Sequence, residues 1–221
     1  MGESRPRVSP PSARVLVLGG PSGSGKSRWS AQLSREFRWP IVRLDDYYKD
    51  VDDPSLPTST LGIADWDDVR SWRCEDAVDA LEQLCRTGEL VAPVYDIAAS
   101  AATGSQQIEL GRADTVIAEG IFAPYVIGPL RERGLLAGAY CVHHNRWVTF
   151  ARRLVRDLSE RRKPPLVLVR RGLRLAAAEP GIIAEQRRLG AEPIRPKELE
   201  RRLRADPLGS FHEQRMDEPR G

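Results

Sequence analysis

The chain has 221 residues, which is enough for one α/β domain, or one domain with a small lid, around a buried core. Its formal charge of +3 is small and its basic residues concentrate between Arg146 and Arg204, so the composition does not indicate a nucleic-acid-binding protein. Three widely spaced cysteines without a C-x-x-C pair imply neither a disulfide framework nor a structural zinc site. The lack of a long apolar stretch or secretory signal predicts a cytoplasmic protein without a membrane span.

The first predicted strand leads directly into a phosphate-binding motif. Residues 1–13 are rich in proline and serine and predict a flexible tail, and the apolar run at residues 15–18 predicts a buried strand. Next comes GPSGSGKS at residues 20–27, which matches the pattern G-x-x-x-x-G-K-S/T. Apolar residues at Trp29, Leu33 and Phe37 predict a helix over residues 26–37 that points its positive N-terminal end at the bound phosphates.

This motif predicts that the chain binds a nucleoside triphosphate. Glycines let successive backbone N–H groups turn around an anion, Lys26 can reach the β- and γ-phosphates, and the Ser27 hydroxyl can ligate Mg²⁺. The chain has only four lysines beside thirty arginines, and one of them occupies the position where a compact ammonium suits phosphates. Nucleotide binding is therefore assigned to Gly20, Ser22, Gly23, Ser24, Gly25, Lys26 and Ser27.

Short apolar runs alternate with helical patterns along the rest of the chain. Runs at residues 41–44, 115–118 and 139–142 predict further strands, and a weaker signal predicts a fifth at 191–194. Helices are expected over residues 69–84, 146–162, 180–189 and 196–204. Prolines end the second of these helices at residues 164–165 and start the third at Pro180. The alternation predicts an α/β fold with a parallel sheet of about five strands and helices on both faces.

Carboxylates follow two of the predicted strands, where ligands of a parallel sheet bind. Asp45 comes after the second run and can orient the hydroxyl of an acceptor, accept its proton and touch the hydration shell of Mg²⁺. The alternative for this aspartate pair is capping of the following helix, and this is the role expected for Asp46. Glu119 follows the run at 115–118 and is placed to hold Mg²⁺ directly or through water.

Six motifs occur in the order in which they occur in one family of kinases. They are GGPSGSGKS (19–27), LDDYYK (44–49), DWDD (65–68), PVYD (93–96), EGI (119–121) and RRLVRDLSER (152–161). The chain resembles the uridine kinase family of P-loop kinases over roughly residues 14–163. The resemblance implies a P-loop NTPase fold, with a kinase domain at 14–208 and an arginine-rich helical lid at about 146–165. Residues 209–221 mix charges with proline and glycine and lack periodicity, which predicts a flexible tail.

The resemblance also implies roles for particular residues. Asp45 takes the position of the catalytic base, Asp67 that of the carboxylate that binds the ribose hydroxyls, and Tyr95 lines the nucleoside pocket. Glu119 lies near Mg²⁺, which enters as Mg·ATP. Arg152 and Arg156, four residues apart on the lid, are expected to neutralise charge on the transferred phosphoryl group, whereas the other lid arginines are expected to form a solvated face.

The sequence departs from the family pattern around the acceptor. Uridine kinases continue the tyrosine motif to a histidine that reads the pyrimidine, but here Ser100 takes that place and no histidine precedes His143. His143 and His144 replace the acidic residues after the fourth strand, and Thr149 replaces an arginine before the lid. The two histidines do not suggest a metal site, because neighbours on a strand point to opposite faces, and their role stays open.

Three functions are compatible with these residues. The leading interpretation is ATP-dependent phosphorylation of a primary hydroxyl, that is, the 5′-hydroxyl of uridine or cytidine. The second is the same chemistry on another nucleoside, a sugar or a pantothenate-like alcohol, and the third is a nucleotide-binding regulator without catalysis. Asp45 argues against the third, because a pure binder does not need a group that activates a hydroxyl. The expected partners are ATP and a small hydroxyl-bearing substrate, and the family resemblance implies a homo-oligomer.

Overall fold

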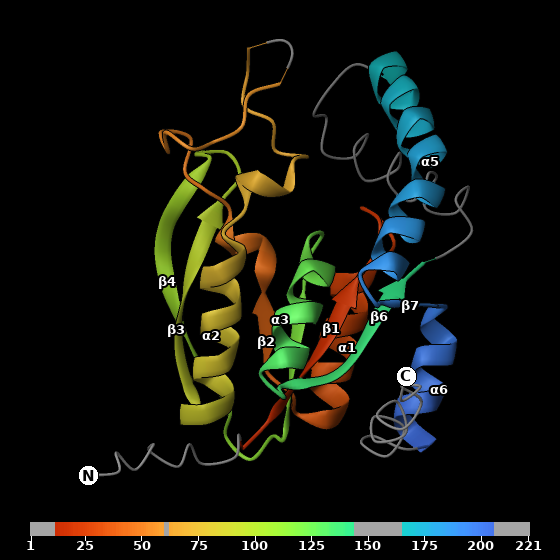
Figure 1. Cartoon of the computed structure of the whole chain (residues 1–221). Helices are drawn as coiled ribbons and strands as arrows, with labels where there is room; N and C mark the ends of the chain where they lie inside the picture. Colours follow the sequence, from red (N-terminus) through yellow and green to blue (C-terminus); the bar gives the residue numbers. More distant parts are fainter. Residues whose placement is uncertain (1–11, 60–61, 144–164, 206–221) are drawn as a thin grey trace, which may run out of the picture.

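A five-stranded parallel sheet forms the centre of the protein. The computed structural model describes residues 12–59, 62–143 and 165–205. In this part of the chain the sheet has the strand order β2-β5-β1-β6-β7, and every neighbouring pair is parallel, as the sequence predicts (Figure 1). The strands are β1 (Arg14–Gly19), β2 (Ile41–Arg43), β5 (Thr115–Glu119), β6 (Leu136–Val142) and β7 (Glu192–Ile194).

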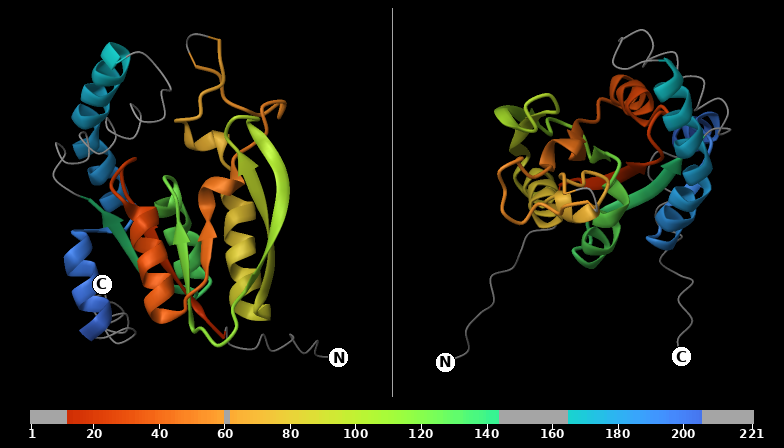
Figure 2. Two further views of the ribbon diagram at one scale, coloured as in Figure 1. Left: turned by 180° about the vertical axis from the view of Figure 1, so that it is seen from behind. Right: turned by 90° about the horizontal axis from the view of Figure 1, so that it is seen from above.

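Helices cover both faces of this sheet. Val15 and Val17 of β1 are fully buried on one face, against α2 and α3, whereas Leu16 and Leu18 are fully buried on the other, against α1 and α6. Burial on both faces explains why the strands are continuous apolar runs. Figures 1 and 2 show the two layers from opposite sides. The helices are α1 (Lys26–Phe37), α2 (Cys74–Thr87), α3 (Ile127–Glu132), α5 (Pro165–Arg188) and α6 (Pro196–Ala205).

A β-hairpin that the sequence analysis did not predict lies beside α2 (Figure 1). Its strands, β3 (Glu89–Asp96) and β4 (Ala101–Glu109), pair antiparallel and form a separate two-stranded sheet. Only a few of its residues are buried, and β4 is mostly exposed and rich in alanine, glycine and glutamine. Such a composition carries little of the apolar alternation by which a strand is recognised.

The helix expected at residues 69–84 begins later than predicted. Residues Val69–Ser71 form the short 3₁₀ turn η2, and Trp72 is extended, with φ −123° and ψ 142°. The indole Nε1 of Trp72 donates a 2.7 Å hydrogen bond to the carbonyl of Leu44, which holds this residue out of a helix. The α-helix then starts at Cys74 and stops before Gly88, whose left-handed conformation (φ 83°) suits glycine.

The prediction that a helix starts at Pro180 is wrong. Helix α5 begins at Pro165 and continues through Pro180 to Arg188. Proline removes one hydrogen bond from a helix interior, and sequence rules therefore treat it as a start or a stop. Here the turns on either side pack onto the protein, because Glu179 and Gln186 are buried and Ile183 packs against the larger core. Tertiary packing outweighs the local preference of proline.

The described part of the chain starts inside the expected N-terminal tail. Both the backbone N–H and the hydroxyl of Ser12 donate to the carbonyl of Cys85, at 3.0 and 2.8 Å, and Ala13 is buried. Residues 1–11 of the tail expected at 1–13, the whole tail expected at 209–221, and residues 146–164 of the lid expected at about 146–165 lie outside the described residues. Among the helices that are described, none combines the length and apolar character needed to cross a bilayer.

Candidate active site

The phosphate loop between β1 and α1 has a backbone that requires glycine. Gly20 has φ +142°, and a Cβ atom there would lie 2.3 Å from the carbonyl oxygen of Val142 at the end of β6. Gly23 and Gly25 are also at positive φ, 79° and 83°. In turns with residues at positive φ, successive backbone N–H groups line a concavity that binds anions. The loop therefore has the geometry of a phosphate cradle.

Helix α1 presents an uncapped N-terminus to this loop. Gly25 is its N-cap residue, no side chain caps the first turn, and the first turn contains no acidic residue. The free N–H groups and the positive end of the helix dipole are thus left for an anionic ligand. Lys26, the first residue of the helix, is buried and adds a positive charge at the same place.

Ser27 and Glu119 meet beside the loop. Glu119 is the last residue of β5 and pairs in register with Leu18 of β1, just before the loop begins. The Ser27 hydroxyl donates a 2.9 Å hydrogen bond to Oε2 of Glu119. Burial raises the pKa of Glu119, an effect that the Ser27 bond and the Lys26 charge partly offset. A buried carboxylate next to a hydroxyl is a set of hard oxygen ligands that suits Mg²⁺.

Asp45 lies next to Glu119 because their strands are neighbours. β2 pairs with β5 so that Arg43 is opposite Glu119, and Asp45 follows in the 3₁₀ turn η1 (Leu44–Tyr47). The backbone N–H of Ile121 donates a 2.8 Å hydrogen bond to Oδ1 of Asp45. A Cβ on residue 120 would lie 2.8 Å from that oxygen, so glycine at this position leaves room for the Asp45 carboxylate. Within the described residues Oδ2 accepts no hydrogen bond, so it can accept one from a substrate.

The neighbouring Asp46 has a different environment and does not cap a helix as expected. Its side chain is buried, and Oδ1 accepts a hydrogen bond of 3.3 Å from the backbone N–H of Tyr95 in β3. Burial raises the pKa of Asp46, although the Tyr95 bond and the Arg43 guanidinium, 3.9 Å away, oppose this. Asp46 therefore ties the hairpin to η1.

Aromatic rings gather beside Asp45. The ring of Tyr48 lies 5.9 Å from that of Trp66, 5.9 Å from that of Tyr95 and 5.8 Å from that of Phe122, centre to centre. Of these four, the sequence analysis singled out only Tyr95, whose hydroxyl donates to the carbonyl of Lys49 at 3.1 Å. Tyr48 lies within the motif that contains Asp45, and Phe122 directly follows the motif that contains Glu119, which was the available signal.

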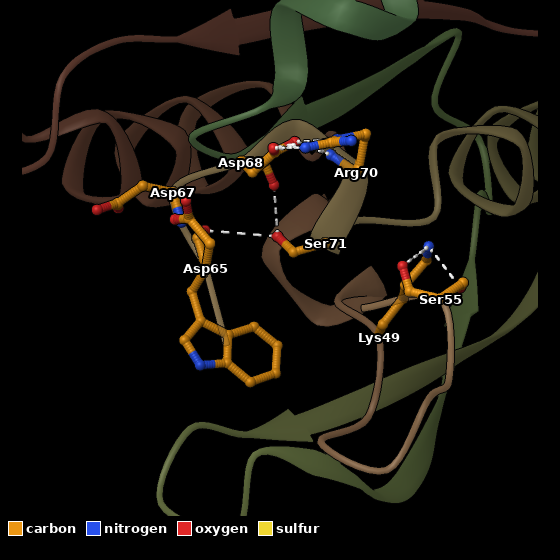
Figure 3. A network of polar contacts seen from close by, with 8 residues as sticks. Lys49, Ser55, Asp65, Asp67, Asp68, Arg70 and Ser71 are labelled. Carbon is orange, nitrogen blue, oxygen red and sulfur yellow. Dashed lines mark hydrogen bonds and ion pairs between the residues drawn. The ribbon is translucent and has the colours of Figure 1, made fainter. Parts of the chain in front are cut away.

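Asp67 is exposed on the loop that carries Trp66. Its backbone N–H donates a 3.2 Å hydrogen bond to Oδ1 of Asp65, and its carboxylate accepts no hydrogen bond within the described residues. Figure 3 shows the Asp67 side chain pointing away from the neighbouring pair in which Arg70 binds Asp68 through both carboxylate oxygens. The assignment of Asp67 to the ribose hydroxyls stays a prediction.

The remaining site predictions divide between described and undescribed residues. Arg152, Arg156 and His144 lie outside the described residues. His143 directly follows β6, and its backbone N–H donates to the carbonyl of Ile194 at 3.1 Å. In the described ranges no three histidine, cysteine or acidic side chains converge on one point.

Comparison with solved structures supports the fold. The chain superimposes on a protein from Silicibacter sp. TM1040 named as a fructose transport system kinase, with a TM-score of 0.58, 18% identity and coverage of 82% of this chain and 88% of that one. For D-glycerate 3-kinase from Cryptococcus neoformans var. grubii the TM-score is 0.52, the identity 13%, and the coverage 89% and 90%. At these identities the likeness shows the fold alone.

Sequence comparison shows the family. No curated protein sequence matches the chain significantly. The model of the phosphoribulokinase/uridine kinase family, however, matches residues 15–164, a span that contains the phosphate loop, Asp45, Asp67, Tyr95 and Glu119. A match over more than half of the chain is decisive, and the chain therefore belongs to the phosphoribulokinase/uridine kinase family, as a P-loop kinase that acts on a small-molecule alcohol.

Proposed function

We propose that this kinase transfers the γ-phosphoryl group of Mg·ATP to a primary hydroxyl, and that the acceptor is the 5′-hydroxyl of uridine or cytidine. The observation that carries the chemistry is the position of Asp45, held by the Ile121 N–H next to the strand whose Glu119 binds Ser27. A carboxylate with one oxygen fixed and the other free is suited to accept the proton of an attacking hydroxyl.

Each residue then has a defined task in the transfer. Asp45 orients the acceptor hydroxyl and takes its proton as the oxygen bonds to the γ-phosphorus. The bond from that phosphorus to the β–γ bridging oxygen breaks, and ADP leaves. The phosphate loop and Lys26 hold the β- and γ-phosphates and stabilise the negative charge in the transition state. Arg152 and Arg156 are proposed to add positive charge from the lid.

Ser27 and Glu119 are proposed to hold Mg²⁺. Both offer hard oxygen atoms, and the raised pKa of Glu119 reflects a buried carboxylate for which a nearby cation would be favourable. Mg²⁺ held by these residues would neutralise negative charge on the phosphates of ATP. Asp45 follows β2, the strand that pairs with the Glu119 strand, and its carboxylate is proposed to contact the hydration shell of the ion.

The aromatic rings beside Asp45 and the Asp67 carboxylate support a nucleoside as the acceptor. The rings of Tyr48, Trp66 and Tyr95 offer flat apolar surfaces for a base, and the exposed Asp67 carboxylate can accept two hydrogen bonds from a vicinal diol. One observation favours a second candidate, a different ring-bearing alcohol or sugar. Ser100 stands where uridine kinases have the base-reading histidine, and no other histidine precedes residue 143.

An acceptor panel tests the proposal. Purified protein with Mg·ATP is offered uridine, cytidine, other nucleosides, fructose, glycerate and pantothenate, and both ADP and phosphorylated product are measured. ADP formation that depends on uridine or cytidine is the expected result. ADP formation with another alcohol alone would replace the acceptor but keep the chemistry. Tight ATP binding without turnover on any acceptor would overturn the proposal in favour of a regulator.

A further inference from the structure

Gln186 is a buried polar residue that the proposed chemistry does not use. It lies near the C-terminal end of α5, the helix that follows the expected lid and packs along β6 and β7 (Figure 1). Only 4% of its surface is exposed. A Cβ atom on Gly19 would lie 2.9 Å from Oε1 of Gln186 and 2.6 Å from Cγ of Pro124. The amide is therefore enclosed between the end of β1 and the 3₁₀ turn η3 (Ala123–Val126).

Two hydrogen bonds connect this amide to Asp45. Nε2 of Gln186 donates to the carbonyl of Ile121 at 3.4 Å, and the N–H of the same Ile121 donates to Oδ1 of Asp45 at 2.8 Å. We propose that Gln186 is a positioning residue, which fixes the backbone of Ile121 and through it the orientation of the Asp45 carboxylate. This inference rests on the proposed role of Asp45 as the base.

The unpaired oxygen of the amide argues against a role in packing alone. Within the described residues Oε1 of Gln186 has no hydrogen-bond partner although it is buried. Burying an unpaired amide oxygen is unfavourable, and an apolar side chain of the same length would fill the space without this penalty. The amide contributes only its donor, Nε2, and that donor serves the segment that orients Asp45.

Replacement of the amide by a side chain of similar length separates positioning from packing. We expect Gln186→Met to lower kcat about tenfold, because a shift of the base by a fraction of an ångström weakens its contact with the hydroxyl, while KM for ATP stays unchanged. The melting temperature of Gln186→Met should stay close to that of the wild type, because loss of the bond to Ile121 and removal of the unpaired oxygen have opposite effects. Ile183→Met, one turn earlier on α5, is the matched control and should keep the wild-type kcat.

A double-mutant cycle with Asp45→Asn decides the question. If Gln186 acts through Asp45, Gln186→Met should lower kcat in the wild-type background and have no further effect on the residual turnover of Asp45→Asn. An equal loss in both backgrounds, or no loss in the wild type, would overturn the inference and leave the base assignment intact. Wild-type turnover of Asp45→Asn itself would instead overturn the proposed function.

Discussion

At the level of the residue, the two adjacent aspartates Asp45 and Asp46 have different roles because their environments differ. Asp45 is half-buried and keeps one carboxylate oxygen without a hydrogen bond inside the described structure, whereas Asp46 is buried and holds the backbone of Tyr95. Asp45 and Asp46 are adjacent in the 3₁₀ turn η1, and their side chains therefore point to different parts of the molecule. Only Asp45 lies beside the strand end that carries Glu119.

Conservative amide substitutions at the two positions should have opposite consequences. We expect Asp45→Asn to lower kcat by about 10²–10⁴-fold, because the amide cannot take the proton of the acceptor, with ATP affinity nearly unchanged. Asp46→Asn keeps an oxygen that can accept from Tyr95 and should keep turnover within about twofold of the wild type. Steady-state kinetics and ATP titration calorimetry check both variants. Equal loss of turnover in the two would contradict the assignment of Asp45 as the base.

Tyr47 offers a second test at single-residue scale. Its side chain is buried, its hydroxyl has no hydrogen-bond partner within the described residues, and burial raises its pKa to about 12. Removal of an unpaired buried hydroxyl is neutral or favourable, so Tyr47→Phe should leave the free energy of unfolding unchanged or raise it by up to about 1 kcal/mol.

The matched control for this substitution is Tyr95→Phe. The Tyr95 hydroxyl donates to the carbonyl of Lys49, and its loss should destabilise the protein by about 0.5–1.5 kcal/mol. Urea unfolding of the two variants beside the wild type gives the comparison. A larger loss for Tyr47→Phe than for Tyr95→Phe would show that the Tyr47 hydroxyl has a partner, such as a buried water.

At the level of the element, the parts that could be predicted are those with strong local signals. The bounds of α1 agree with the prediction because the phosphate loop defines its start and apolar residues at helical spacing define its length. Ser27, Asp45 and Glu119 could be placed near one another because each follows a strand of a parallel sheet. For these residues the chain order and the sheet rule are sufficient to predict proximity.

The elements that were missed depend on contacts between distant segments. The hairpin β3–β4 is half-exposed and carries a weak pattern, and its position depends on the buried Asp46, which lies far away in the sequence. Pro180 lies inside α5 because both neighbouring turns pack onto the protein. The rings around Tyr48 come from three separate segments, and no rule of spacing brings them together.

The close contact between the phosphate loop and the end of β6 can be tested by mutation. A Cβ on Gly20 would lie 2.3 Å from the carbonyl oxygen of Val142, and its φ of +142° disfavours any other residue. We expect Gly20→Ala to deform the loop and to weaken ATP binding by about tenfold or more. This magnitude follows from the free-energy cost of backbone strain, which is about 1–3 kcal/mol.

The control is a glycine with room for a side chain. Nothing lies within 4 Å of a Cβ on Gly128, which is in α3 and has no positive φ. Gly128→Ala should therefore raise the free energy of unfolding by about 0.4–1 kcal/mol and leave ATP binding unchanged. Calorimetric titration with ATP and urea unfolding measure the two effects. Wild-type ATP affinity in Gly20→Ala would exclude the loop as the triphosphate site.

At the scale of the whole molecule, Glu119 links folding stability to pH and to ligand. Burial raises the pKa of Glu119 above its ordinary value of 4.5, so the folded state holds this proton more tightly than the unfolded state. The stability that this group contributes is fully present below pH 4.5 and is lost as the pH rises through the folded pKa. A glutamine at this position does not titrate, and Glu119→Gln should therefore gain stability relative to the wild type as the pH rises.

The measurement is urea unfolding of wild type and Glu119→Gln at a series of pH values between about 4 and 8. Carboxylates whose pKa is lowered, such as Asp68 and Glu82, destabilise both proteins equally at low pH, so the difference between the two curves isolates Glu119. Mg·ATP at a hundredfold excess over Kd should stabilise the wild type by about 2.7 kcal/mol and the variant by less, because the carboxylate ligand of Mg²⁺ is gone. If the difference in free energy of unfolding between the two proteins is constant across the pH range, the raised pKa of Glu119 is contradicted. If Mg·ATP stabilises the two proteins equally, the metal ion does not bind at Glu119.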